Sequence, residues 1–275
     1  METADSWLRF ITQLYTPNPA EFDAARSHRN SIEARLDAYI GLHEMFEIGS
    51  LKHGTGVWNY SDADFLVSLT GTRPSSIWTM LNKVKEALQG RFQTTPIVVR
   101  RPAVVCQFSD ADVEIVPAYP VASGSGYYIA DPSDGWMTTY PKEHNQYVTT
   151  INSRHDGNVK RLVRQLKTWK YKRSVPVSSC YLEMRATKYM AGENTYAPLW
   201  DLYASLNRLF ESGLAAMNDP TGLSSRFGAC SSEANRQDAL SKLNTAVIRA
   251  RKASDFAYDG DHPSSIEQLK LLFNY

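Results

Sequence analysis

The chain has 275 residues, of which 43% are hydrophobic and 21% are charged, so it can bury a substantial core and intrinsic disorder is excluded. Its formal net charge of +1 argues against a protein whose whole surface binds nucleic acid, so any phosphate-binding charge must be local. The cysteines number three and show no CxxC spacing, which indicates reduced thiols.

The N-terminal segment does not have the pattern of a secretory signal. Its sequence, METADSWLRFITQLYTPNP, carries acids and prolines where a signal needs a basic and then an apolar stretch. No apolar run approaches the ~20 residues that a membrane-spanning helix requires. We therefore expect a cytoplasmic protein that makes no use of a membrane.

The first half of the chain mixes helical and strand patterns. Residues 31–48 predict one long helix, because apolar residues recur there at three- and four-residue spacing. A second helix is predicted over 75–88, ended by Gly90. Apolar and β-branched runs predict strands at 62–69, 97–101, 103–108 and 113–116. This half is therefore α+β.

From about Asn145 onward the pattern is helical. Helices are predicted over 157–172, 178–190, 197–212, 231–257 and 264–273. Ser264 and Glu267 match a capping box for the last of these helices. The glycine-rich stretch 123–126 is interpreted as a flexible connector. The sequence thus divides into an α+β part over 1–144 and a helical lobe over 145–275.

Asp62 and Asp64 lie two residues apart at the start of a predicted strand. Side chains alternate between the faces of a strand, so these carboxylates share one face. Two carboxylates on one face repel each other, which is tolerable if solvent surrounds them or if they share divalent cations. On this pair alone, a solvated surface and a metal site both stay open.

Gly49 and Ser50 precede this pair and favour a functional site. A glycine lets the backbone come close to a phosphate, and backbone N–H groups with the serine hydroxyl can donate to phosphate oxygens. A Gly-Ser dipeptide by itself is common in turns, so its weight comes from its position upstream of Asp62 and Asp64.

A third acid comes from the predicted strand that follows Asp110. Asp110, Asp112 and Glu114 alternate, so all three share one face. We select Glu114 as the third ligand because it lies in the central part of that strand, and Asp112 is the alternative. Carboxylate oxygens of this kind suit Mg²⁺ or Mn²⁺, and two such ions could activate a hydroxyl and neutralise charge on a phosphate.

The pattern Gly49-Ser50, Asp62-Ala-Asp64 and Glu114 resembles that of the polymerase-β-like nucleotidyltransferases. Longer segments narrow the resemblance to the bacterial cyclic-oligonucleotide synthases, or CD-NTases, which are relatives of cyclic GMP-AMP synthase. These segments are GSLKHGTGVWNYSDADFLV, VEIVPAY, Trp136, LVRQLKTWK and SSCYLE. The resemblance implies an α+β nucleotidyltransferase core over 1–144, packed against the helical lobe, with the nucleotide cleft between them.

The resemblance also implies roles for residues of the helical lobe. Lys167 and Ser179 match the family positions that hold the donor triphosphate. An aromatic residue often follows that serine to stack on the nucleobase, whereas this chain has Cys180 there and then Tyr181, which is one candidate for base stacking. Trp58 and Tyr60, before Asp62, are the alternative stacking residues.

Two classes of function stay open on the sequence alone. Zinc sites and Ser-His-Asp hydrolases lack their usual spacings in the sequence. The first class is an enzyme that makes a cyclic di- or trinucleotide from NTPs, with an RNA-tailing transferase as its alternative. The second is a catalytically inactive nucleotide or RNA sensor. For the enzyme, the resemblance implies two Mg²⁺ ions, anti-phage (CBASS) signalling to an effector encoded elsewhere, and activation by a nucleic acid or protein.

Overall fold

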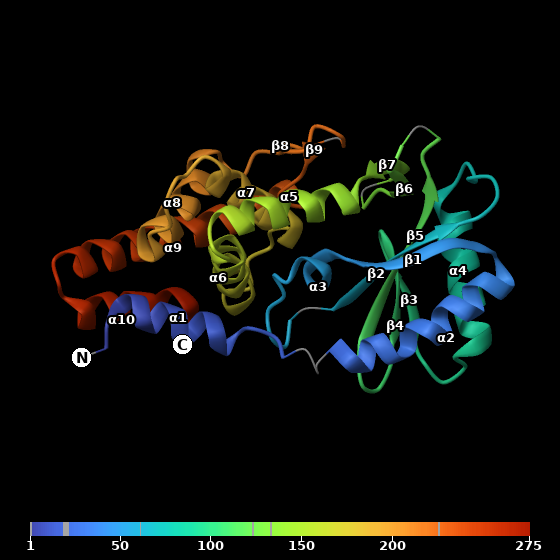
Figure 1. Cartoon of the computed structure of the whole chain (residues 1–275), viewed down its shortest axis with the longest axis horizontal. Helices are drawn as coiled ribbons and strands as arrows, with labels where there is room; N and C mark the ends of the chain where they lie inside the picture. Colours follow the sequence, from blue (N-terminus) through green and yellow to red (C-terminus); the bar gives the residue numbers. More distant parts are fainter. Residues whose placement is uncertain (1, 19–21, 61, 123, 133, 225) are drawn as a thin grey trace.

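The computed structural model describes residues 2–18, 22–60, 62–122, 124–132, 134–224 and 226–275. Two lobes lie side by side along the long axis of the molecule, one built on a sheet and one of helices (Figure 1). Both chain termini lie in the helical lobe (Figure 1). Among the described residues, no helix combines the length and the apolar character needed to cross a membrane.

The sheet is mixed, with strand order β1-β2-β5-β4-β3. Its strands are β1 (Leu42–Ile48), β2 (Ala63–Leu69), β3 (Ile97–Arg100), β4 (Ala103–Gln107) and β5 (Asp112–Pro120). The β2 and β5 strands run parallel, whereas the other neighbouring strands are antiparallel. The end of β5 also pairs with β6 (Tyr127–Ala130), which pairs with β7 (Trp136–Thr139). The central parallel pair is the part of the sheet that carries the predicted acids.

One face of the sheet is covered by α2 (Asp23–Tyr39) and α4 (Ile77–Arg91). Phe65 of β2 and Ile115 of β5 are fully buried in the core formed with these helices. Because side chains alternate along a strand, Asp64 and Glu114 point to the opposite face. The fold therefore directs both acids away from α2 and α4.

The helical lobe has one shared core, which joins α1 to the C-terminal helices. Its elements are α1 (Ala4–Leu14), α5 (Pro141–Arg154), α6 (Asn158–Lys172), α7 (Ser179–Ala191), α8 (Pro198–Glu211), α9 (Glu233–Tyr258) and α10 (His262–Phe273), with the short strands β8 (Met217–Asn218) and β9 (Arg226–Phe227). The predicted division groups α1 with the α+β part, but Trp7 and Ile11 of α1 belong to the core of the helical lobe.

The helix predicted over 31–48 is wrong in its second half. The α2 helix starts earlier and ends at Tyr39, Gly41 follows with φ of +89°, and residues 42–48 form β1. Pairing with β2 provides this segment with a hydrogen-bonded partner, which overrides its local helical spacing.

Two predicted helix boundaries also differ. Gly90 lies inside α4, which continues to Arg91. The last helix is capped by Asp261, whose side chain accepts a hydrogen bond from Ser264 N, so Ser264 is not the cap. Asp261 is a favourable N-cap residue and starts the helix one turn earlier than predicted.

Of the connector 123–126, residue 123 lies outside the described residues, and the rest lies between β5 and β6.

Candidate active site

A cavity of about 330 Å³ brings residues of the sheet lobe together with residues of α6 and α7. It is lined by the predicted residues Gly49, Ser50, Tyr60, Asp62, Asp64, Glu114, Lys167 and Ser179. These residues come from segments more than a hundred positions apart in the sequence. The fold therefore assembles the expected phosphate loop, acids and helical-lobe residues around one space.

Asp64 and Glu114 lie directly opposite each other on the parallel strands β2 and β5. Their carboxyl groups lie close enough for Glu114 to raise the pKa of Asp64. Asp62 precedes β2 and lies on the same face two residues before Asp64. Asp112 is paired with Gln107 at the beginning of β5, two residues before the position that faces Asp64. The register therefore favours Glu114 over Asp112 as the third acid.

The three carboxyl groups repel each other in a partly dry environment. Burial raises the pKa of Asp64 well above its ordinary value, and the charges of Glu114 and Asp62 raise it further, whereas Lys167 acts in the opposite direction. Burial and Asp62 also raise the pKa of Glu114. Burial and Asp112 raise the pKa of Asp62. The cluster thus carries negative charge that the surrounding protein only partly offsets.

A divalent cation fits the chemistry of this cluster. Its oxygen donors are those that Mg²⁺ prefers, and a cation would reverse the repulsion that raises the pKa values of Asp62, Asp64 and Glu114. Within the described ranges, no group of three His, Cys, Asp or Glu side chains is already arranged to hold an ion.

We expect Mg²⁺ to raise the melting temperature of the parent chain by several degrees and to have little effect on Asp64→Asn. Acids whose folded pKa is raised cost no stability below their unfolded pKa, and the cost grows as the pH rises through the folded pKa. In EDTA, Asp64→Asn should therefore melt above the parent at about pH 8, and the difference should shrink toward about pH 4. Scanning fluorimetry measures both effects. Equal responses of parent and variant to Mg²⁺ would contradict this account of the cluster.

The short helix α3 (Gly49–His53) brings Ser50 to the cavity directly after β1. Gly49 has φ of +62°, and a Cβ added there would collide with the Asp64 carboxylate. Only glycine combines this backbone conformation with so close an approach. The Gly-Ser turn is thus placed against the acid cluster, as the sequence motif predicted.

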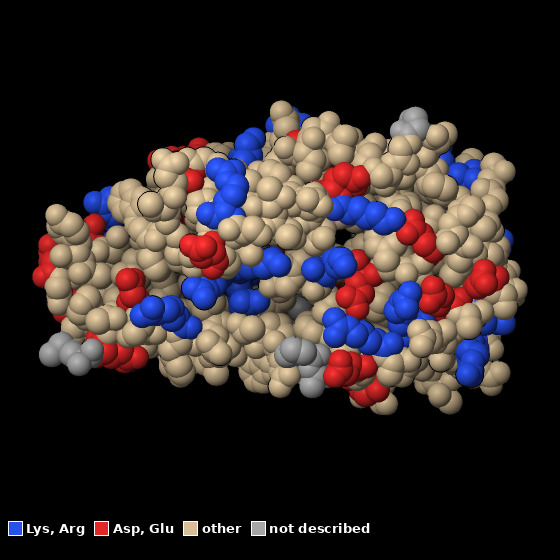
Figure 2. Space-filling model, in the orientation of Figure 1, with Lys and Arg blue, Asp and Glu red and all other residues tan. Residues whose placement is uncertain are grey.

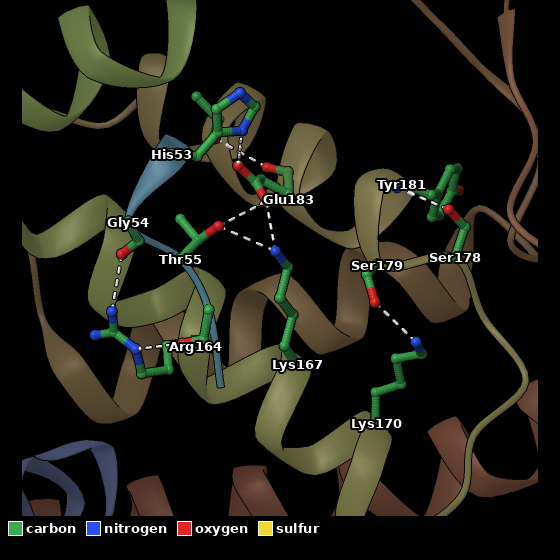
Figure 3. Close-up of polar contacts among 12 residues, drawn as sticks. His53, Gly54, Thr55, Arg164, Lys167, Lys170, Ser178, Ser179, Tyr181 and Glu183 are labelled. Carbon is green, nitrogen blue, oxygen red and sulfur yellow. Dashed lines mark hydrogen bonds and ion pairs between the residues drawn. The ribbon is translucent and has the colours of Figure 1, made fainter. Parts of the chain in front are cut away.

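Lys167 reaches the cavity but is 2% exposed and already engaged. Its Nζ donates to Glu183 Oε2 at 2.5 Å and to Thr55 Oγ1 at 3.0 Å (Figure 3). The other carboxylate oxygen of Glu183 lies 2.5 Å from His53 Nδ1. Burial alone would raise the pKa of Glu183, but Lys167 and His53 hold it well below its ordinary value. Lys167 therefore belongs to a buried ionic network between the lobes that is centred on Glu183.

Ser179 begins α7 and is contacted by a second lysine. Lys170 Nζ donates to Ser179 Oγ at 2.8 Å (Figure 3). The Tyr171 hydroxyl lies 3.1 Å from the same oxygen. The ring of Tyr171 stacks on Tyr60 with centroids 4.8 Å apart. Burial, together with Lys167, lowers the pKa of Lys170 to about 8. Lys170 and Ser179 thus form a polar pair at the rim of the cavity beside an aromatic stack.

The predicted stacking residues have different outcomes. Tyr181 is fully buried, and its hydroxyl donates to Ala215 O at 2.7 Å, so its assignment to base stacking is wrong. The turn of α7 carries Tyr181, two residues after Ser179, into the helical core. Trp58 packs against Tyr15 and is not among the residues that line the cavity. Tyr60 does line the cavity and remains the candidate.

Sequence reasoning missed five residues at this site, namely His53, Thr55, Lys170, Tyr171 and Glu183. The helical spacing places Lys170 on a basic helix face, where a solvated lysine is the ordinary expectation. Glu183 offered a signal, because an acid within an otherwise apolar stretch of a helix needs a partner when it is buried. The partner itself depends on the packing of α6 against α7, which the sequence does not display.

Comparison with known proteins identifies the family. The model of the Second Messenger Oligonucleotide or Dinucleotide Synthetase (SMODS) domain matches residues 1–152. The chain belongs to this family. A probable cyclic nucleotide synthase of Bacillus cereus (strain VD146) is 34% identical over 112 residues, which cover 38% of the SMODS chain and 34% of the relative. A cyclic AMP-AMP-AMP synthase of Acinetobacter sp. is 24% identical over 184 residues, covering 62% of the chain and 52% of the relative. The matches thus span from a third to a half of these relatives.

Solved structures show the same fold along the whole chain. Escherichia coli MS115-1 CdnC, solved with ATP, has a TM-score of 0.79 at 16% identity and covers 100% of this chain and 98% of its own. The Bradyrhizobium diazoefficiens CD-NTase CdnG, solved with GTP, has a TM-score of 0.72 at 12% identity. The match covers 100% of this chain and 99% of CdnG. The expected α+β, polymerase-β-like fold of the bacterial CD-NTases is confirmed for this SMODS protein.

Proposed function

We propose that this chain is a metal-dependent nucleotidyltransferase that joins NTPs into a cyclic di- or trinucleotide. The observation that carries the proposal is the assembly of three acids, Asp62, Asp64 and Glu114, in one cavity with Ser50 and Ser179. A sensor that only binds nucleotides has no need to place mutually repelling carboxylates on neighbouring strands. The SMODS family description and the names of the curated relatives support the same reaction class.

In this proposal each lobe contributes a different part of the site. The backbone at Gly49 and the hydroxyls of Ser50 and Ser179 bind the triphosphate of the donor nucleotide. Lys167 also contacts this triphosphate. Asp62, Asp64 and Glu114 hold two Mg²⁺ ions, which would supply Lewis-acid stabilisation of charge on the phosphates when bound. The carboxylates also orient the attacking hydroxyl of the acceptor. Tyr60, stacked on Tyr171, offers an aromatic face to a base.

We expect Lys170 to add a pH-dependent charge for triphosphate binding, because its ammonium contacts Ser179. Its pKa of about 8 means that the charge is lost as the pH rises through that value. The kcat/KM for NTPs should therefore fall above about pH 8 in the parent, since this ratio reports groups of the free enzyme. Lys170→Arg should extend the plateau of kcat/KM to higher pH. In Lys170→Met, kcat/KM should be low and should not change with pH in this range. A parent-like decline in Lys170→Met would contradict this role.

The proposed biological role is signalling in anti-phage (CBASS) defence in the bacterial cytoplasm. The cyclic product would act on an effector encoded elsewhere. Activation by a protein or a nucleic acid is part of the proposal, and one structural relative supports the protein alternative. That relative, Escherichia coli MS115-1 CdnC, was solved in complex with HORMA-deltaN and matches 94% of this chain with a TM-score of 0.73 at 17% identity.

Pyrophosphate release tests the reaction class. The purified chain is incubated with each NTP alone, with NTP pairs, and with NTPs plus a single-stranded RNA primer, all in Mg²⁺. The proposal predicts release from NTPs without a primer and no release in EDTA. Release that depends on the primer, with lengthening of the RNA, would instead identify a tailing transferase. The absence of release under all of these conditions would favour the inactive sensor.

A further inference from the structure

A second cavity lies on another side of α6, between α6, α1 and the start of α8. Its volume is about 330 Å³, equal to that of the candidate active site and at the lower end of the range for small-molecule sites. Gln165 lines this second cavity, whereas Lys167 lines the first. Side chains two positions apart on a helix point roughly 200° apart, so α6 separates the two cavities.

The floor of the second cavity has an unused hydrogen-bond acceptor. Gln165 is 3% exposed, and its Nε2 donates to Thr12 Oγ1 at 3.0 Å. The Thr12 hydroxyl in turn donates to Leu8 O at 2.6 Å. Gln165 Oε1 accepts no hydrogen bond within the described parts of the chain, although Tyr196 lies near the Gln165 amide. A buried acceptor without a partner is costly, and a ligand with an N–H or O–H group would satisfy it.

The rim of the second cavity is basic. It is lined by Arg9, Arg161 and Arg164, and Arg9 has no ion pair within the part of the chain that the structure describes. Arg161 donates to the neutral side chain of Asn158 on its own helix. Asp5 raises the pKa of Tyr196, which also lines this cavity, so Asp5 is a nearby negative charge that opposes the arginines. Lys and Arg side chains gather over the region of α6 and α1 on this face (Figure 2). Guanidinium groups of this kind bind phosphate.

Arg164 connects the second cavity with the first. Its side chain lines the second cavity and donates to Gly54 O at 2.8 Å and to Gly56 O at 2.9 Å (Figure 3). Thr55, between those glycines, is hydrogen-bonded to Lys167 and Glu183 in the network beside the acids. A ligand that moves or fixes Arg164 therefore acts on the loop that follows the Gly-Ser turn.

We propose that the second cavity is a regulatory site for a small phosphorylated ligand of mononucleotide size. Its phosphate binds Arg9 and Arg161, and an amino group of its base donates to Gln165 Oε1. Occupancy changes turnover in the first cavity through Arg164. The binding itself is independent of the proposed function, whereas the effect on turnover rests on it.

Isothermal titration with nucleoside monophosphates tests the binding in the full chain, with AMP as the first probe and GMP, CMP and UMP after it. The Arg9→Ala/Arg161→Ala variant alters the second cavity, and Ser50→Ala/Ser179→Ala is the matched variant of the first. We expect the affinity for at least one monophosphate to fall by about tenfold or more in the arginine variant and to change less than about twofold in the serine variant. Gln165→Met, which removes the free acceptor, should also weaken binding, and its melting temperature reports whether the lobe stays folded.

The opposite pattern, in which the serine variant loses binding and the arginine variant keeps it, would overturn the proposal. So would the absence of binding by all four monophosphates at millimolar concentration. For regulation, the bound monophosphate should change pyrophosphate release by the parent but not by Arg9→Ala/Arg161→Ala. Because the arginine variant should still release pyrophosphate from NTPs, failure of the second site is distinguishable from failure of the proposed function.

Discussion

The Asp62→Asn/Asp64→Asn variant is expected to form product at about a thousandth of the parent rate or less. Asparagine keeps the size of each side chain but removes both negative charges from the face shared with Glu114. In the proposed reaction these charges hold the cations that neutralise the triphosphate, so their removal should nearly stop turnover. Pyrophosphate release from NTPs in Mg²⁺, followed over time, measures the loss.

The matched control is Asp110→Asn, which removes the same charge from a nearby exposed acid whose partner is His28. Its activity should stay within about twofold of the parent. A second comparison separates the candidates for the third acid, because Glu114 faces Asp64 in register whereas Asp112 lines a neighbouring cavity. Glu114→Gln should lose nearly as much activity as the double variant, and Asp112→Asn much less. Reversal of that order would make Asp112 the third ligand.

Lys167→Met is expected to lower the free energy of unfolding by about 3–5 kcal/mol, in addition to any loss of activity. The variant leaves Glu183, which is 3% exposed, without its closest cation in a buried position. Urea unfolding followed by fluorescence measures the change. The double variant Lys167→Met/Glu183→Gln should recover part of the lost stability, because it removes the unpaired charge as well.

The control for this prediction is Lys83→Met on α4, an exposed lysine whose removal should change stability by less than about 0.5 kcal/mol. If Lys167→Met is as stable as Lys83→Met yet inactive, Lys167 acts on the substrate alone and the buried network has no structural role. If Lys167→Met loses stability and retains the parent KM for NTPs, its predicted contact with the triphosphate is wrong.

The sequence contained enough information to locate the acids but not to show how they meet. Alternation places Asp62 and Asp64 on one face of a strand and Glu114 on one face of another. Their proximity depends on the parallel pairing of β2 with β5, which brings together segments about fifty residues apart. The resemblance to known nucleotidyltransferases implied that the three acids share one site, but the strand pairing that brings them together was not predicted.

Errors arose where local spacing competes with long-range contacts. Residues 42–48 have apolar spacing compatible with a helix, and short apolar runs are ambiguous between helix and strand. Hydrogen bonding to β2 decides for a strand. Likewise, Tyr181 lies one position after the aromatic site of the family, and packing of α7 buries it, whereas Tyr60 is brought into the cavity by a loop. Each outcome depends on tertiary packing.

The central claim, that this cavity closes nucleotides into a ring, is tested most directly by the mass of the product. The chain is incubated with all four NTPs and Mg²⁺, the mixture is treated with phosphatase, and the remaining nucleotides are analysed by mass spectrometry beside the Asp62→Asn/Asp64→Asn reaction. A ring-closing enzyme should give a phosphatase-resistant species whose mass equals two or three nucleoside monophosphates minus one water for each linkage, ring closure included. This species should be absent from the variant reaction. Linear products only, or equal amounts of the cyclic species from parent and variant, would contradict the central claim.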